Sequence, residues 1–294
     1  MRPVFRDARW LRPPFGATLP AMLRWLPILA VLASIACGGA GGGTPAPAPP
    51  LSPELATDPR FQELYRAVAA GGEAAEAHRA LAIALHEARY YAAAVEQFEA
   101  ATAIDASPRT LLDLALGYTS AARLRDAERT YKRLLELEPR HATALHNLGN
   151  LSYKWGDNDA AIAYYRRSLA ANPDYLLAQF HLAEALRHGE QFKEAYRAYE
   201  QVLELEPDSP AAVEAFDNAL YQLASLDIKM GAHERAGRLL VELLKANPNH
   251  PSANYALGQV LLTMGRTEEA ARAFEAHQRV RTAMKPDGPT ATGE

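Results

Sequence analysis

Few side chains in this 294-residue chain have the types and spacing that enzyme chemistry needs. The sequence contains nine histidines and one cysteine, and it has no His-Glu-x-x-His motif, no glycine-rich phosphate loop and no nucleophile elbow. His146 and His181 could form half of a metal site, but they would need Glu184 or another ligand in a defined geometry. The alternative is that both histidines are polar residues on a binding surface. We therefore expect no catalytic activity, no metal and no cofactor.

The single cysteine, Cys37, follows an uncharged apolar segment that spans residues 25–36. This segment is too short to cross a bilayer, Arg24 precedes it, and it ends in small residues, as a secretory signal peptide does. The sequence therefore predicts a signal peptide over residues 1–36, with Met22 as an alternative translation start. An exported chain with a lone thiol cannot form an internal disulfide, so the thiol calls for another explanation.

The segment "ASIAC", residues 33–37, resembles the bacterial lipobox. In lipoproteins of that kind the cysteine is acylated, with palmitate a typical chain, and becomes the mature N-terminus. More than one acyl chain then gives a stable membrane anchor. Gly38 stands where an aspartate would resemble an inner-membrane retention signal, so the resemblance implies an outer-membrane lipoprotein that faces the periplasm. The alternative is an incidental cysteine within an ordinary signal sequence.

Both ends of the remaining chain have compositions that differ from its middle. Residues 37–58 are rich in Gly, Ala and Pro without apolar periodicity, which predicts a tether that holds the rest of the protein away from the lipid. Asp58 can then cap a helix over residues 59–72, in which Phe61 and Leu64 would cover the open end of the helices that follow. Residues 285–294 are polar and rich in helix breakers, which predicts a disordered tail.

Between these ends the sequence repeats with a period of 34 residues. A proline closes each of three copies, with an alanine twelve residues before it and a tyrosine eight residues before it. These anchors are Pro139, Pro173 and Pro207, then Ala127, Ala161 and Ala195, then Tyr131, Tyr165 and Tyr199. Such anchors indicate a helical hairpin, because the small residue lets two helices approach closely and the proline ends the second helix.

This pattern resembles the tetratricopeptide repeat family, which has the same period. The resemblance covers residues 75–284 and implies an all-α fold, a right-handed superhelical solenoid of about six helix-turn-helix repeats. The expected repeats are residues 75–107, 108–141, 142–175, 176–216, 217–250 and 251–284. Seven extra residues, 210–216, predict a first helix about two turns longer in the next copy, extending about 10 Å past its neighbours. That overhang is either a lid or docking surface, or a lengthened helix without a role.

Stacked repeats create a concave surface lined by the first helix of each pair, and such surfaces bind peptides and protein segments. The lining positions that the resemblance implies are His146, Asn147, Asn150, Tyr153, Phe180, His181, Glu184, Arg187, Tyr221 and Gln222. Asparagine amides can hold a peptide backbone, while Tyr and Phe offer flat apolar anchors. We therefore expect a protein partner that binds as an extended segment.

The charge of the chain argues against one class of partner. From Cys37 onward there are 26 basic and 34 acidic residues, a net charge of −8. A nucleic-acid-binding protein would carry a basic stripe, and none is evident in the sequence. We expect no nucleic-acid partner.

These observations together predict a non-catalytic scaffold, tethered to the outer membrane of a bacterium, that holds a partner protein during assembly of an envelope complex. A repeat lipoprotein on a short tether is similar to the pilotin-type proteins of type IV pilus and secretion systems. The alternative is an accessory subunit that positions a cell-wall or glycan-synthesising enzyme. An enzyme in its own right is the third class, for which the sequence offers no motif.

Overall fold

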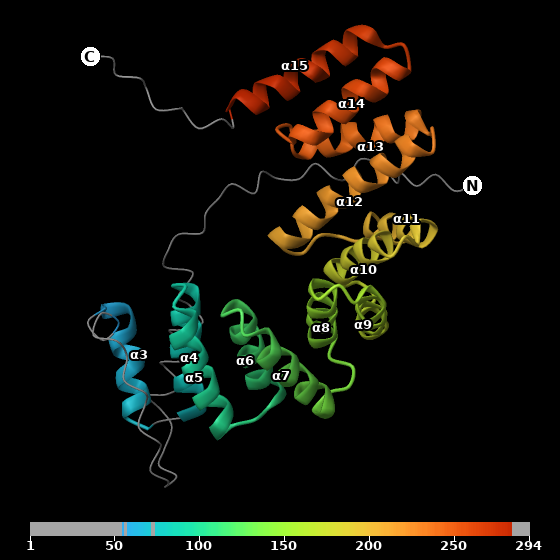
Figure 1. The fold of residues 1–294 in the computed structure, drawn as a ribbon. Coiled ribbons are helices and arrows are strands. Elements are labelled where there is room, and N and C mark those ends of the chain that lie inside the picture. Colours follow the sequence, from blue (N-terminus) through green and yellow to red (C-terminus); the bar gives the residue numbers. More distant parts are fainter. Residues whose placement is uncertain (1–54, 56–57, 72–73, 284–294) are drawn as a thin grey trace, which may run out of the picture. The chain divides into compact units, whose positions relative to one another are not determined.

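The computed structural model describes residue 55 and residues 58–71 and 74–283, which contain thirteen helices and no strand (Figure 1). The expected all-α repeat fold is therefore confirmed for this part of the chain. The signal peptide, Cys37, nearly all of the tether and the C-terminal tail lie outside the described residues. The helices are α3 (Pro59–Ala69), α4 (Ala74–Glu87), α5 (Tyr91–Ile104), α6 (Pro108–Ser120), α7 (Leu124–Leu137), α8 (Ala142–Lys154), α9 (Asn158–Ala171), α10 (Leu176–His188), α11 (Phe192–Val202), α12 (Pro210–Lys229), α13 (His233–Ala246), α14 (Pro251–Thr263) and α15 (Thr267–Ala283).

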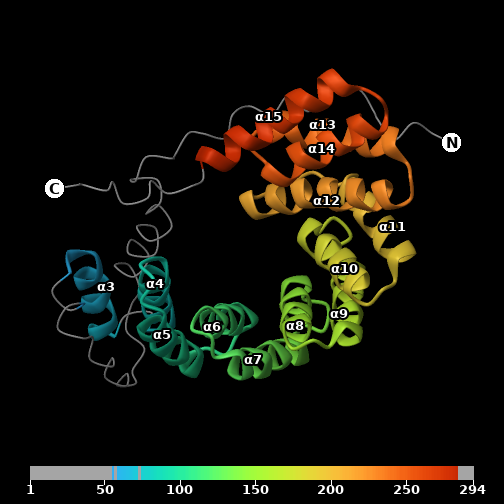
Figure 2. The same ribbon diagram turned by 45° about the horizontal axis from the view of Figure 1, so that its top comes forward.

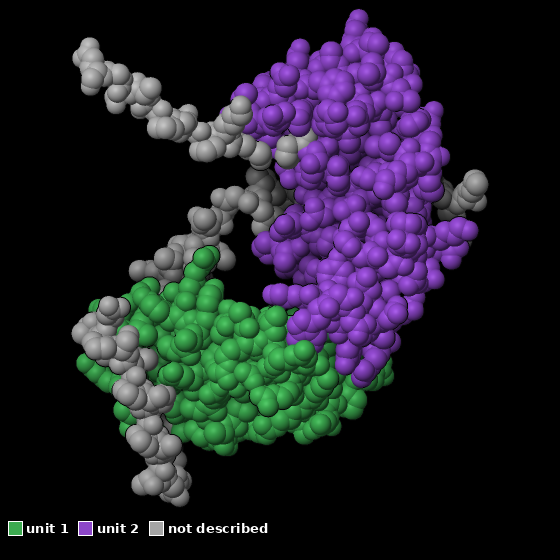
Figure 3. All heavy atoms as spheres, in the orientation of Figure 1, with its two compact units in different colours: residues 1–151 green, residues 152–294 purple. Residues whose placement is uncertain are grey.

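The chain divides into two compact units, residues 1–151 and residues 152–294, and the boundary falls within α8 (Figure 3). In unit 1, each helix from α3 to α7 packs against the next one along the chain. In unit 2, the same holds from α9 to α15, as the two views of the ribbon show (Figure 1, Figure 2). Each unit is thus a stack of antiparallel helix pairs.

One turn conformation closes the first helix of all six described pairs. A residue with positive φ follows each first helix: Arg89 (67°), Ala122 (59°), Gly156 (82°), Glu190 (59°), Gly231 (76°) and Gly265 (75°). In the fourth turn, the Glu190 amide donates to the Arg187 carbonyl at 3.2 Å and the Gln191 amide donates to the Leu186 carbonyl at 2.9 Å. The other five turns repeat both bonds at equivalent residues, and this is the Schellman motif. These turns fall at one position of the repeat in every hairpin.

The tyrosine and alanine anchors of the sequence repeat form the core. Tyr131, Tyr165 and Tyr199 are among the largest fully buried side chains, and the alanines at 127, 161 and 195 are fully buried beside them. A small side chain lets the helices of a pair approach closely, and the tyrosine ring fills the space that remains. At the N-terminal end, α3 packs on α4 and buries Phe61, Leu64 and Val68.

Helix α12 is 20 residues long and contains the seven inserted residues. Ser209 caps it, accepting a hydrogen bond from the Ala212 amide at 3.2 Å. The expected longer first helix is confirmed, since α12 has 20 residues against 13 in both α10 and α14. Its extension does not project freely, because Ala212 and Ala215 are buried and belong to the core of unit 2. The preceding helix α11 ends at Val202, about a turn earlier than the other second helices.

The turn geometry generates a stability prediction. Ala122 holds the left-handed conformation with a Cβ atom, which costs roughly 1–2 kcal/mol that glycine avoids. We expect Ala122→Gly to raise the free energy of unfolding by about 1 kcal/mol in urea unfolding followed by circular dichroism. The matched control is Ala100→Gly within α5 of the same unit, which should lower stability by about 1 kcal/mol. Equal losses from both variants would show that the turn is not strained.

Candidate protein-binding surface

A row of aromatic side chains crosses the first helices of the pairs in unit 2. Phe180 on α10, Tyr221 on α12 and Tyr255 on α14 occupy equivalent places in the repeat, 41 and then 34 residues apart. Helix α10 packs against α12, and α12 packs against α14, so the three residues lie on adjacent helices. Tyr255 is 46% exposed, and the other two are half-buried. We call these three residues the aromatic row.

Each member of the aromatic row has a histidine ring beside it. The centroid distances are 5.5 Å for Phe180 and His181, 5.4 Å for Tyr221 and His250, and 5.3 Å for Tyr255 and His277. The row therefore offers flat apolar faces with ring nitrogens at their borders. Such a surface suits a chain segment that presents both apolar side chains and backbone polar groups.

His181 is held from below by the core. Its ring stacks on the buried Tyr165 at 5.9 Å, with 30° between the planes. Burial lowers the pKa of His181 below its ordinary value, so the ring is neutral at pH 7. A neutral imidazole has one donor and one acceptor nitrogen and carries no charge.

Glu184 and Arg187, two more predicted lining residues, form an ion pair with each other. The Glu184 carboxylate accepts a hydrogen bond from the Tyr199 hydroxyl and another from Arg187 Nη2 at 2.7 Å. That bond raises the pKa of the Arg187 guanidinium further above its ordinary value, so Arg187 stays charged. Arg187 Nη2 also lies 2.8 Å from His188 Nε2, and the His188 ring meets the edge of Tyr153 at 5.5 Å. This cluster fixes the end of α10 and leaves little charge for a ligand.

Three predicted lining residues belong to the part of α8 that lies in unit 1. Asn147 and Asn150 are half-buried there, as a lining role requires. His146 is only 5% exposed, which corrects the expectation that it lines an open surface. Gln222, the last predicted residue, is half-buried on α12 beside Tyr221.

The structure adds two residues that the sequence reasoning missed. Tyr255 continues the aromatic row onto α14, and the Gln259 amide donates to its hydroxyl at 3.1 Å. The signal was present in the sequence, because Tyr255 stands 34 residues after Tyr221. Extending the 34-residue register by one more repeat would have found it.

A buried polar cluster joins α11, α12 and α13 and was not predicted. Asp227 is 1% exposed; it accepts a hydrogen bond from the Tyr196 hydroxyl at 2.7 Å and faces Arg235 at 3.5 Å. Arg235 also donates to Glu200 at 2.6 Å. Burial raises the pKa of Asp227 above its ordinary value. The cluster is a structural device that ties the fourth and fifth hairpins together.

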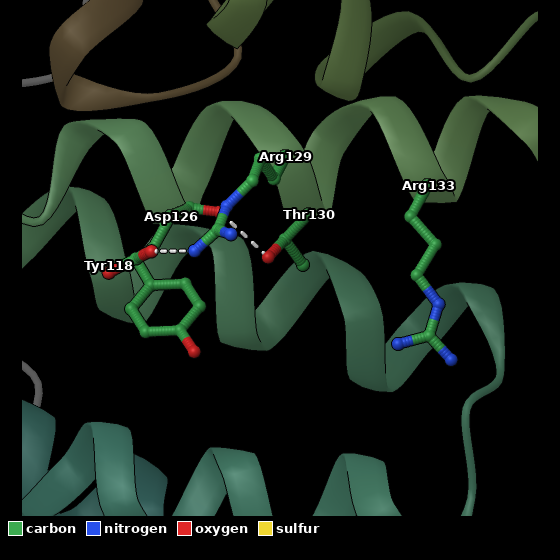
Figure 4. Close-up of a pocket in the computed structure, with 5 residues that line it drawn as sticks. All are labelled: Tyr118, Asp126, Arg129, Thr130 and Arg133. Carbon is green, nitrogen blue, oxygen red and sulfur yellow. Dashed lines mark hydrogen bonds and ion pairs between the residues drawn. The ribbon is translucent and has the colours of Figure 1, made fainter.

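A shallow hollow of about 230 Å³ lies in unit 1 (Figure 4). Tyr118, Asp126, Arg129, Thr130 and Arg133 line it. Arg129 and Thr130 both donate to Asp126, the first to its carboxylate and the second to its backbone carbonyl. Burial and a hydrogen bond to Glu99 raise the pKa of Tyr118 to about 12. Arg129 and Thr130 are thus paired with Asp126 inside the hollow, whereas Tyr118 is paired with a residue outside it.

Among the residues that the structure describes, no three or more His, Cys, Asp and Glu side chains gather in a way that could hold a metal ion. In the same part of the chain, every helix is too short or too polar to cross a membrane.

The repeat can now be compared with known proteins. The tetratricopeptide repeat family model matches residues 112–175 and 221–289, and a second model of the same description matches residues 152–216. The chain belongs to the tetratricopeptide repeat family. Helices α4 and α5 lie before the matched residues, yet their turn at Arg89 has the same conformation as the other five.

Curated relatives match part of this chain. The chain is similar to tetratricopeptide repeat-containing protein trd-1 of Caenorhabditis elegans, with 31% identity over 147 residues that cover 49% of this chain and 18% of that protein. It is also similar to RNA polymerase-associated protein CTR9 of the same organism, with 26% identity over 181 residues, 58% of this chain and 15% of the relative. The chain thus spans less than a fifth of the length of these relatives.

Solved structures share the fold at low sequence identity. Pseudomonas aeruginosa PilF aligns with a TM-score of 0.59 and 15% identity, over 72% of this chain and 98% of PilF. MamA aligns with a TM-score of 0.52 and 18% identity, over 62% of this chain and 98% of MamA. YrrB, described as a tetratricopeptide repeat protein with an unusual peptide-binding site, aligns with a TM-score of 0.50 and 18% identity, over 66% of this chain and 96% of YrrB.

The Glu184 cluster generates a second prediction. Glu184→Gln removes the charge that Arg187 and the Tyr199 hydroxyl face, and should lower the free energy of unfolding by about 1–2 kcal/mol. The matched control is Glu194→Gln, because Glu194 pairs with Arg166 in solvent and its loss should cost under about 1 kcal/mol. Urea unfolding of both variants decides. Equal small effects would mean that the cluster does not hold the end of α10.

Proposed function

We propose that this protein is a non-catalytic scaffold that binds an extended protein segment along the first helices of its repeats. The observation that carries the proposal is the aromatic row, because three equivalent side chains on adjacent helices form a periodic surface. The cluster of Glu184 and Arg187 borders this surface with charges that are already paired. Recognition by the row would therefore rest on apolar contact and hydrogen bonding, with little charge attraction.

The spacing of the row suits an extended chain. Packed helices lie about 8–10 Å apart, and an extended segment rises about 3.3 Å per residue. Every third residue of a bound segment would thus meet one member of the aromatic row. The peptide-binding site described for YrrB belongs to that protein, and it is consistent with a peptide role for this fold.

We further propose that Cys37 is acylated and anchors the scaffold to the bacterial outer membrane on its periplasmic side. The support is the apolar segment of residues 25–36 that ends in "ASIAC" and the absence of any other cysteine from the sequence. The Gly- and Pro-rich residues after Cys37 would then separate the helices from the lipid.

The setting for such a scaffold is assembly of a pilus, a secretion system or another envelope complex. The acidic net charge of −8 from Cys37 onward supports a protein partner over nucleic acid. The second candidate is an accessory subunit that positions a cell-wall or glycan-synthesising enzyme. The paired charges of Glu184 and Arg187 suit a static platform of either kind equally.

The row is tested by Tyr221→Ala and Tyr255→Ala. Each variant removes an exposed or half-buried ring and should reduce capture of partner protein from envelope extracts by about tenfold, since aromatic anchors dominate such interfaces. Captured proteins are quantified by mass spectrometry against the unchanged chain. Tyr164→Ala is the matched control, because Tyr164 is a half-buried tyrosine on the second helix α9. Equal capture by all three variants would contradict the row as the binding surface.

The anchor is tested separately by Cys37→Ser. Serine lacks the thiol to which the lipid would be attached, so the variant should leave the membrane pellet and collect in the soluble periplasmic fraction. Fractionation followed by immunoblotting measures the distribution. If the serine variant still pellets with the membranes, the anchor lies elsewhere in the chain.

A further inference from the structure

The exposed apolar side chains of unit 2 concentrate at the hairpin turns. Trp155, Phe192 and Met230 are 39%, 52% and 63% exposed, and each lies at the turn between the first and second helix of a pair. Leu262, also exposed, is in the last turn of α14. Of the large apolar residues that are exposed in the described part of unit 2, only Val241 and Tyr255 lie away from these turns.

Lysines accompany these residues. Lys154 precedes Trp155, Lys193 follows Phe192, and Lys229 precedes Met230. All three lysines are exposed, and Lys245 is the only other lysine among the described residues of unit 2. We call Trp155, Phe192, Met230 and their three lysines the turn edge.

Contacts between the pairs show that these turns lie in line. Tyr153, two residues before Trp155, meets His188 at the end of α10. Tyr196 at the start of α11 bonds to Asp227 at the end of α12. Because consecutive packed helices joined by short connections alternate in direction, the turns fall along one side of unit 2. The turns after α12 and α14 lie on the same side in both views (Figure 1, Figure 2).

We propose that the turn edge rests against the head-group layer of a phospholipid bilayer. Trp155, Phe192 and Met230 would enter the boundary between head groups and acyl chains, where aromatic side chains are favoured. The lysine ammonium groups would reach lipid phosphates, since long basic side chains extend toward the head groups while their stems lie on apolar surface. The proposal rests on the membrane anchoring proposed above, which brings the protein to the lipid.

A bilayer fits the placement of these residues. The apolar side chains stand on separate turns along one side of unit 2. A flat, deformable partner can receive such separate projections.

Electrostatic attraction to anionic lipid is not the driving force. Five acidic residues are also exposed near these turns and outnumber the three lysines: Asp157, Asp159, Glu190, Glu194 and Glu234. Three small apolar insertions bind weakly alone, so the contact needs an anchor that raises the effective concentration of unit 2 at the surface.

The experiment couples the chain from Cys37 onward to maleimide lipid in phosphatidylethanolamine and phosphatidylcholine vesicles. Cys37 is the only thiol, so coupling is specific, and it supplies an anchor whether or not cells acylate this residue. Trp155 is then the only tryptophan and reports directly on the turn edge. We expect its emission to shift to the blue on coupling and to be quenched by brominated acyl chains.

Variants separate this contact from anchoring alone. The double variant Phe192→Ser, Met230→Ser should cut the quenching by at least about twofold, because it removes two of three apolar insertions. Val241→Ser is the matched control: it removes an exposed apolar side chain from α13, away from the turns, and should leave the quenching unchanged. Circular dichroism confirms that each variant is folded.

Three results would overturn the proposal. Trp155 emission that stays unshifted and unquenched after coupling would show that the turn edge does not meet lipid. Equal losses for the control and the double variant would show that the contact is unspecific. A shift that arises only when envelope proteins are added would assign the turn edge to a protein partner. The Cys37→Ser fractionation is a separate measurement. If that variant still pellets with membranes, the proposed anchor at Cys37 is wrong, whatever the vesicle experiment shows.

Discussion

The fold depends on one backbone constraint, which is the left-handed residue that closes the first helix of each pair. After α12, for example, this residue is Gly231. The amide of the next residue, Ala232, donates a hydrogen bond to the Asp227 carbonyl at 2.8 Å. The bond fixes where the helix ends and the direction in which the next one begins. Three of the six positions are glycine; Arg89, Ala122 and Glu190 hold the same conformation against the preference of their Cβ atoms. Packing of the pairs therefore outweighs local backbone preference at these turns.

The turn fixes how successive helix pairs align. The same repeat spacing therefore places equivalent residues both in the core and on the surface. Tyr165 and Tyr199 are buried on second helices, while Phe180 and Tyr221 recur at an equivalent place on first helices. An insertion of seven residues adds about two helical turns and leaves this alignment intact. Helix α12 accordingly keeps Tyr221 in the aromatic row although its N-terminal half is longer than in any other pair.

The sequence predicts the fold well because its strongest signals are local. Proline, tyrosine and alanine anchors depend on the chemistry of one hairpin, and all of these tyrosines and alanines are buried where the pattern indicates. Prediction fails where the outcome depends on neighbouring hairpins. The sequence could not show that Ala212 is buried, or that Tyr196, Asp227 and Arg235 meet from three helices. The candidate site could be predicted in part. The repeat spacing predicts which positions face the surface, but it does not predict that Glu184 pairs with Tyr199 and Arg187.

Several charged side chains of unit 2 are paired with one another, and this limits which charges are available to a ligand. Glu184 faces Arg187 within α10, Asp227 faces Arg235 across α12 and α13, and Glu269 faces Arg266 at the start of α15. A buried, paired charge such as that of Asp227 cannot be given to a ligand without a large desolvation cost. The groups that remain available include exposed lysines and carboxylates, aromatic rings and the apolar side chains of the turns. The apolar groups among these bind by contact area, which suits the proposed platform for a protein partner.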